Sequence, residues 1–199
     1  MTLILPDVSK QISSDDIEKL MEKNFATIMS VWIPLQLEWI NNVYRTFRDY
    51  EKFMIIMYLL MKTFDTYSKN FVKLTYDEYF NQNEIEIDKI NVMKISKSLN
   101  IPKETARRKV NELEEMGVIK RVNKKIIIDK NTWPNIKPEE TMKRVTRFLS
   151  TLSKIGVNEG IISRPFSIED LVQTCKEYFS YVWKLYYEMQ MPMLLGFKK

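Results

Sequence analysis

The spacing of apolar residues predicts a mainly helical chain. Between Ser13 and Asp49, apolar residues recur at helical intervals, and the serines and aspartates at the start suit a helix N-terminus. Pro34 lacks the amide hydrogen that a helix needs at this point, so we expect it to kink or break the segment. Residues 50–67 are apolar on nearly every side in their first half, which predicts a central, buried helix.

Polar residues interrupt this pattern at 69–90, which predicts a polar connection with a short helical turn. Two further helices are expected towards the C-terminus. One runs over about 139–154 and is ended by Gly156 and Gly160. The other covers about 167–191 after a start that resembles a capping box.

A helix-turn-helix pattern follows the polar connection. A short helix with Ile95 and Leu99 facing inward ends at Asn100, a residue that readily adopts the left-handed conformation. Pro102 then gives a second helix, at about 103–116, a preset start. The two helices are therefore expected to be joined by a tight turn.

The second helix of this pattern has an inward and an outward face. Its small and apolar residues, Ala106, Val110 and Leu113, fall on one side and would face the core. At about 100° per residue, a different set points away from that side. This outward set consists of Glu104, Arg108 and Asn111, flanked by Thr105 and Arg107.

Two β-rich segments follow Gly117 and predict a wing. Residues 118–122 and 125–128 are joined through Asn123 and Lys124, where asparagine tolerates the positive φ of a tight hairpin. The predicted order is therefore helix, turn, helix and two-stranded wing.

Basic residues are concentrated in the same region. Residues 91–130 hold eleven lysines and arginines against five acids, a net charge of +6, whereas the whole chain carries +5. A surface that attracts a polyanion would therefore be confined to residues 91–130. A solvated basic face without a nucleic-acid partner is the other interpretation that the charge allows.

This stretch resembles the winged helix-turn-helix superfamily, most closely regulators of the MarR (multiple antibiotic resistance regulator) type. The resemblance covers about residues 91–130. That family usually has Leu, Ala, Leu, Gly, an apolar residue, Thr, Val, Leu, Gly and Leu at the positions held by Ile95, Ser96, Leu99, Asn100, Ile101, Thr105, Ala106, Leu113, Gly117 and Val118. The connection at 69–90 is much longer than is usual in the family. The implied fold is mainly α: a three-helix core with a short β-wing, extended by N- and C-terminal helices.

The resemblance implies a recognition helix in the DNA major groove, with the wing beside it. Arg107 or Arg108 suits guanine O6 and N7. Asn111 suits adenine, and Glu104 suits the amino group of cytosine. The other residues expected to bind DNA, mostly through phosphates, are Lys103, Thr105, Lys120, Arg121, Lys124 and Lys125. Aromatic residues, which single-strand binders use for stacking, are missing between positions 81 and 131, and this favours duplex DNA.

The last helix is unusually rich in aromatic residues. Three interpretations are open: a core helix, a subunit interface, or a pocket for an aromatic or lipid-like effector. Because one recognition helix reads only a few base pairs, we expect a homodimer. Its expected interface residues are Tyr178, Phe179, Trp183, Tyr186 and Tyr187. Cys175 is interpreted as a small core residue, with a redox-sensing thiol as the alternative.

The composition argues against most enzyme classes. The chain has no histidine, a single cysteine, no glycine-rich phosphate loop and no metal-ligand spacing. We therefore expect no catalytic residues, no metal and no cofactor. The lone cysteine suits a reducing cytoplasm, the first residues do not resemble a signal peptide, and the longest apolar run, Phe53–Met61, is too short to span a bilayer.

These observations predict a cytoplasmic, dimeric regulator that binds double-stranded DNA sequence-specifically. The alternative is a winged-helix protein-interaction or assembly module without specific DNA contacts. A small-molecule effector of unknown identity is a further candidate partner, and no membrane association is expected. The expected parts are N-terminal helices at 1–68, the last of them in the winged-helix core, a polar connection at 69–90, the helix-turn-helix and wing at 91–130, and C-terminal helices for dimerisation at 131–199.

Overall fold

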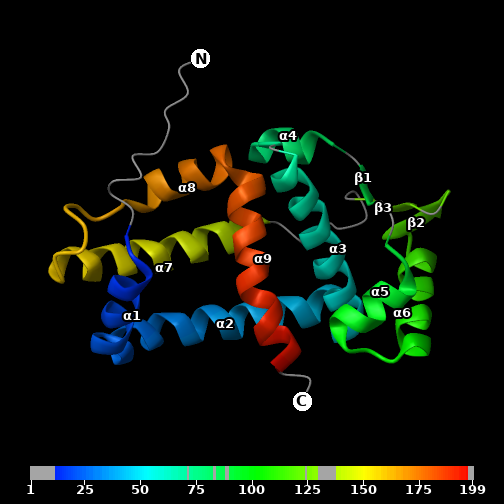
Figure 1. Ribbon diagram of the computed structural model, residues 1–199, viewed down its shortest axis with the longest axis horizontal. Coiled ribbons are helices and arrows are strands. Elements are labelled where there is room, and N and C mark those ends of the chain that lie inside the picture. Colours follow the sequence, from blue (N-terminus) through cyan, green and yellow to red (C-terminus); the bar gives the residue numbers. More distant parts are fainter. Residues whose placement is uncertain are drawn as a thin grey trace. The chain divides into compact units, whose positions relative to one another are not determined.

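The computed structural model is mainly helical, with a small antiparallel sheet, as the sequence predicts (Figure 1). It describes residues 12–70, 72–82, 84–87, 90–123, 125–129 and 138–196. The chain divides into two compact units. Unit 1 comprises Met1–Glu38 with Glu139–Val172, and unit 2 comprises Trp39–Pro138 with Gln173–Lys199.

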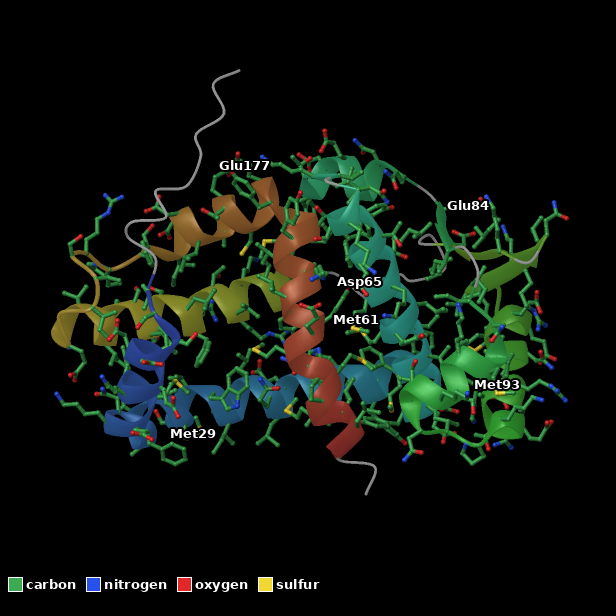
Figure 2. All side chains as sticks on the ribbon, in the orientation of Figure 1. Met29, Met61, Asp65, Glu84, Met93 and Glu177 are labelled. Carbon is green, nitrogen blue, oxygen red and sulfur yellow. The ribbon has the colours of Figure 1, made fainter. Side chains whose placement is uncertain are left out.

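Unit 1 is built from helices only, within the described residues. It contains α1 (Ser14–Lys23), the first part of α2 (Phe25–Phe47), α7 (Pro138–Asn158) and the start of α8 (Ile168–Glu177). Leu20, Ile28 and Ile155 form its buried core, against which side chains such as Met29, labelled in Figure 2, pack.

The first helical segment breaks at Asn24 and not at Pro34, where the sequence led us to expect the break. Asn24 leaves the helical conformation, and both its backbone amide and its side-chain amide donate to the Leu20 carbonyl at 3.1 Å. Its side chain also donates to Glu159 Oε1 at 3.2 Å. Pro34 stays inside α2, because the φ that its ring fixes is close to the helical value.

Gly156 does not end α7, contrary to the prediction. The helix continues to Asn158, and Gly160, at φ +71°, follows it. A Cβ at Gly156 would lie 3.4 Å from Ile162 Cγ1 and 3.8 Å from Leu20 Cδ1. A Cβ at this position would therefore make ordinary van der Waals contacts, and the packing of α7 on α1 within unit 1 does not require a glycine here.

Unit 2 is organised around α3 (Tyr50–Lys69), whose residues 53–60 are all buried, as predicted. This helix packs against α5 (Val92–Leu99), α6 (Lys103–Glu115) and β1 (Glu84–Ile87), and also against α9 (Phe179–Gly196). Unit 2 also contains α4 (Tyr76–Asn81), β2 (Ile119–Val122), β3 (Lys125–Asp129), the second part of α2 and the end of α8. Figure 1 shows α5 and α6 side by side, with the sheet next to them.

The sheet has three strands in the order β1-β3-β2, whereas the sequence predicted only the hairpin of two. In register, Ile128 of β3 lies between Ile85 of β1 and Ile119 of β2, and all three are buried. The polar connection thus contains α4 and also β1, in which Glu and Ile alternate and both isoleucines are buried. Four residues were too few for that alternation to stand out among the surrounding acids.

The expected long C-terminal helix is divided at Tyr178 into α8 and α9. At the start of α9, the Ser180 amide donates to the Leu74 carbonyl at 3.1 Å, and the Leu74 amide donates to Ser180 Oγ at 3.0 Å. The Ser180 amide is therefore engaged outside the helix, and a continuous helix is interrupted here. Within the described residues, no helix combines the length and the apolar character that crossing a bilayer requires.

Candidate nucleic-acid interface

The turn between α5 and α6 is fixed by local hydrogen bonds, as the sequence predicts. Asn91 caps α5 by accepting the Lys94 amide hydrogen at 2.9 Å. Asn100 ends α5 in the left-handed conformation, with φ 49°. Ser96 Oγ donates to the carbonyl of the buried Ile101 at 2.7 Å, which closes the turn over the core.

The inward face of α6 is the predicted one. Ala106, Val110 and Leu113 are all buried. Gly117 follows the helix at φ +73°, and the Val118 amide donates back to the Leu113 carbonyl at 3.0 Å, in the manner of a Schellman turn. The opposite face of α6 is therefore directed to solvent.

Two ion pairs hold α6 on the N-terminal end of α3. Lys109 Nζ lies 2.5 Å from Asp49 Oδ2, and Lys52 Nζ lies 2.9 Å from Glu112 Oε2. Asp49 is also the N-cap of α3, accepting the Lys52 amide hydrogen at 3.1 Å. Lys109 is thus a structural residue, although it contributes to the basic charge of the region.

This pairing changes the acid–base properties of its members. Burial raises the pKa of Asp49, but hydrogen bonds from Lys109 and from the Lys52 amide outweigh it, so the pKa is lowered overall. The hydrogen bond to Asp49 raises the pKa of Lys109, and the one from Lys52 lowers the pKa of Glu112. All three groups are charged near neutral pH.

We expect Asp49→Ala to lower the free energy of unfolding by about 2–3 kcal/mol at pH 7. The change removes a helix cap and leaves Lys109 without its carboxylate partner. Because the pKa of Asp49 is lowered on folding, its contribution is complete above the ordinary carboxyl pKa of about 4. It is lost as the pH falls below that value, through the folded-state pKa.

Urea unfolding at pH 7 and pH 3 measures this effect. Asp77→Ala, which removes an exposed acid from the first turn of α4, is the control and should change stability by less than about 0.5 kcal/mol. An Asp49→Ala deficit that is equally large at both pH values would contradict the assignment.

The exposed face of α6 carries arginines in weak, accessible ion pairs. Arg107 Nη1 lies 3.0 Å from Glu104 Oε2, and Arg108 Nε lies 3.7 Å from Glu112 Oε1. Exposed pairs of this kind stabilise a protein by only about 0–1 kcal/mol, so both guanidinium groups can exchange partners at little cost. Lys103 is exposed at the start of the helix and has no ion-pair partner among the described residues, and Thr105 is half-buried.

Basic residues of the wing also form ion pairs within the protein. Lys120 Nζ lies 3.3 Å from Glu84 Oε1, on β1 (labelled in Figure 2), and 3.8 Å from Asp129 Oδ2. Arg121 forms an ion pair with Glu114 and donates to Asn111 Oδ1 at 3.0 Å. Asn111, Lys120 and Arg121 therefore have partners within the protein, as Glu104, Arg107 and Arg108 do on α6.

The hairpin turn itself agrees with the prediction, because Asn123 has a φ of 50°. Lys125 is half-buried in β3. The predicted site residue Lys124 lies outside the described residues.

The structure thus places the predicted site residues in two groups. Lys103, Glu104, Arg107 and Arg108 share the exposed surface of the first two turns of α6. Asn111 and Arg121 form a second group, which Glu114 joins. Sequence reasoning missed Glu114, because no periodicity relates a helix residue to one on the following strand.

Four of the five aromatic residues predicted for a dimer interface are buried inside unit 2. Phe179 packs on rings of α3 and α4, Tyr187 on a ring of α3, and Tyr186 on Trp39 of α2, while Trp183 stacks on its neighbours in α9. Of the five, only Tyr178, at 39% exposure, lies on the surface. The core-helix interpretation therefore applies to these four.

Cys175 is also buried, and burial raises the pKa of its thiol. A protonated, buried thiol reacts slowly with oxidants. This favours the interpretation of Cys175 as a core residue.

Together, the helix-turn-helix, the recognition-type helix α6 and the β2–β3 hairpin define a winged helix-turn-helix. Residues 86–130 match the family of DeoR-like helix-turn-helix domains, which belongs to this superfamily. No curated protein and no solved structure was found to match the chain. The domain suggests DNA binding and transcription regulation.

Proposed function

We propose that this protein is a transcription regulator that binds double-stranded DNA sequence-specifically as a homodimer, with α6 in the major groove. The observation that carries the proposal is the exposed face of α6. Its arginines, Arg107 and Arg108, are held only by surface ion pairs at 3.0 and 3.7 Å, in a domain of the DeoR-like helix-turn-helix type. Planar guanidinium groups on such a helix suit bidentate contacts with guanine.

The roles of the other residues on this face follow from their chemistry. Glu104, next to Arg107, can accept from the amino group of cytosine. Lys103 is the first residue of α6, and its ammonium group suits a contact with a phosphate of the DNA backbone. We keep Thr105, Lys124 and Lys125 as further predicted backbone contacts. The closeness to MarR-type regulators, the cytoplasmic location and a small-molecule effector also remain predictions.

Selection of bound duplexes from a random DNA pool, at physiological salt, tests the proposed function. We expect an enriched motif with two-fold symmetry, because a dimer presents two α6 helices to two half-sites. Recovery of no motif above background would favour the alternative, a winged-helix module that binds protein.

We further propose that the dimer forms through the outer side of α9. Tyr178, Val182, Leu185 and Met189 follow one another at intervals of four, three and four residues, the spacing of a helix seam. Leu185 is 65% exposed and Met189 is 46% exposed, so this stripe presents apolar surface that a partner could cover. Packing against the same stripe of a second copy would bury both.

Light scattering at micromolar concentration measures the assembly directly. The chain has a mass of 23.9 kDa, so a dimer should give about 48 kDa. Leu185→Glu with Met189→Glu should shift the mass towards that of the monomer, whereas Glu188→Gln, on the same helix, should not. A parent protein that is monomeric throughout this range would rule out the dimer.

Lys103→Ala is expected to weaken binding to all duplexes alike. Loss of one phosphate contact in each subunit of the dimer should reduce the slope of log affinity against log salt by about 1.8, twice the value of about 0.9 for one contact, without changing the preferred sequence. Titrations of a selected and a scrambled duplex at several salt concentrations measure this slope. A change in sequence preference would instead place Lys103 at a base edge.

A further inference from the structure

A small hollow, which we name the α2–α7 pocket, lies between two helices within unit 1. Its volume is about 170 Å³. One face of each helix lines it, because the lining residues follow one another at intervals of three, one and three positions on both helices. The lining consists of Val31, Pro34, Leu35 and Glu38 of α2 and of Arg144, Arg147, Phe148 and Thr151 of α7. All of these residues belong to unit 1.

Half of the lining is apolar. Leu35 is buried and Phe148 is half-buried. The ring centroid of Phe148 lies 5.0 Å from that of Trp32, a contact that steadies the Phe148 ring. An apolar cavity of about 150 Å³ holds a benzene molecule, so the α2–α7 pocket has room for an apolar group of about six carbon atoms.

Two arginines give the pocket its charge. Arg144 Nε lies 3.2 Å from Glu38 Oε2, and the Arg144 side chain is only 23% exposed, so Glu38 fixes it in the wall. Arg147, about one turn further along α7, is exposed and forms no ion pair among the described residues. Glu140, an acid near both arginines, is paired with Lys143 at 3.1 Å. Two arginines against one glutamate leave the lining with a net charge of +1.

We propose that the α2–α7 pocket binds a small monocarboxylate with an apolar body of about six carbon atoms. A guanidinium group is a planar fork of donors that matches the two oxygens of a carboxylate. A single carboxylate balances the net charge of the lining, and the guanidinium group of Arg147 is open to it. The apolar body would cover Pro34, Leu35 and Phe148 and remove their surface from water.

Chemical-shift titration of the full, isotope-labelled chain tests this proposal, with sodium hexanoate as the probe. We expect saturable shifts of the amide signals of residues 31–38 and 144–151, with a dissociation constant below about 1 mM, an ordinary value for a ligand of this size. Each buried methylene raises affinity about fourfold, so butanoate should bind about fifteenfold more weakly. Hexanamide has the same body without the charge and should bind at least about tenfold more weakly.

Two variants separate the charge of the pocket from its space. Arg147→Met removes the guanidinium group and should lower the affinity for hexanoate at least about tenfold. Thr151→Phe keeps both arginines but fills the hollow with a ring, and it should abolish saturable binding. Lys154→Met is the matched control, because Lys154 is an exposed base of α7 that lies outside the lining. This control should bind hexanoate as the parent does.

The proposal is overturned if hexanoate gives no saturable shifts up to about 10 mM, or if the shifts lie outside α2 and α7. It is also overturned if hexanamide binds as well as hexanoate, or if a folded Arg147→Met or Thr151→Phe variant keeps the parental affinity. An equal loss in Lys154→Met and Arg147→Met would contradict it too, since net charge alone would then explain the effect. Circular dichroism establishes whether each variant folds, and if Thr151→Phe does not, Arg147→Met decides.

This proposal and the proposed function fail independently. The titration contains no DNA, so a chain that does not bind hexanoate still binds a selected duplex if α6 reads DNA. A chain that enriches no duplex still binds hexanoate if the α2–α7 pocket is a carboxylate site.

Discussion

Phe179→Ala is expected to lower the free energy of unfolding by about 3–5 kcal/mol, the largest single effect that we predict. The Phe179 ring is completely buried, with ring centroids of Tyr79 at 5.0 Å and Trp183 at 5.1 Å. Its removal would leave a cavity at the junction of α3, α4 and α9. Because the free energy of unfolding of small domains is only about 5–15 kcal/mol, the substitution would remove much of the stability.

Urea denaturation followed by circular dichroism measures the change, with Tyr44→Ala as the control. Tyr44 is an aromatic residue of α2 at 58% exposure, so its loss should cost less than about 1 kcal/mol. Repeating the experiment at several protein concentrations distinguishes core from interface. A core effect of Phe179→Ala is independent of concentration, whereas an interface effect would vary with it.

Arg108→Ala is expected to lower the affinity for the selected duplex by about 1–3 kcal/mol, while thermal stability stays the same. The Arg108 side chain is 65% exposed, and its contact with Glu112, at 3.7 Å, is too long to contribute much to folding. The lower affinity should therefore come from weaker base recognition and not from a less stable fold. Affinity for unrelated duplexes should fall much less.

Fluorescence anisotropy with the selected and a scrambled duplex measures both affinities. Lys154→Ala removes one positive charge from an exposed position of α7, outside the winged domain, and is the control for net charge. If Arg108→Ala binds the selected duplex as the parent does, α6 does not read DNA through this residue.

The helix-turn-helix could be predicted because neighbouring residues determine it. Asn100 and Gly117 adopt positive φ where the sequence placed the ends of α5 and α6. The inward set of Ala106, Val110 and Leu113 follows from helical periodicity alone. Both kinds of signal act over a few residues, and both can be found by inspection.

The features that were missed depend on residues far apart in the chain. Lys109 meets Asp49 across sixty positions, and β1 pairs with β3 although the helix-turn-helix lies between them. The break before α9 depends on a bond between Ser180 and Leu74. No local pattern reports such contacts. Only the folded chain shows which basic residues remain available for DNA.

The central position of α3 has a consequence for the boundaries of the DNA-binding module. The segment 86–130 that matches the domain family closes its core on α3, which in turn packs against α9. Excised alone, this segment would expose the inner sides of Ile95, Leu99 and Leu113 to water. A self-sufficient fragment must include chain from both sides of the motif, so the unit that is recognisable in sequence is smaller than the unit that folds.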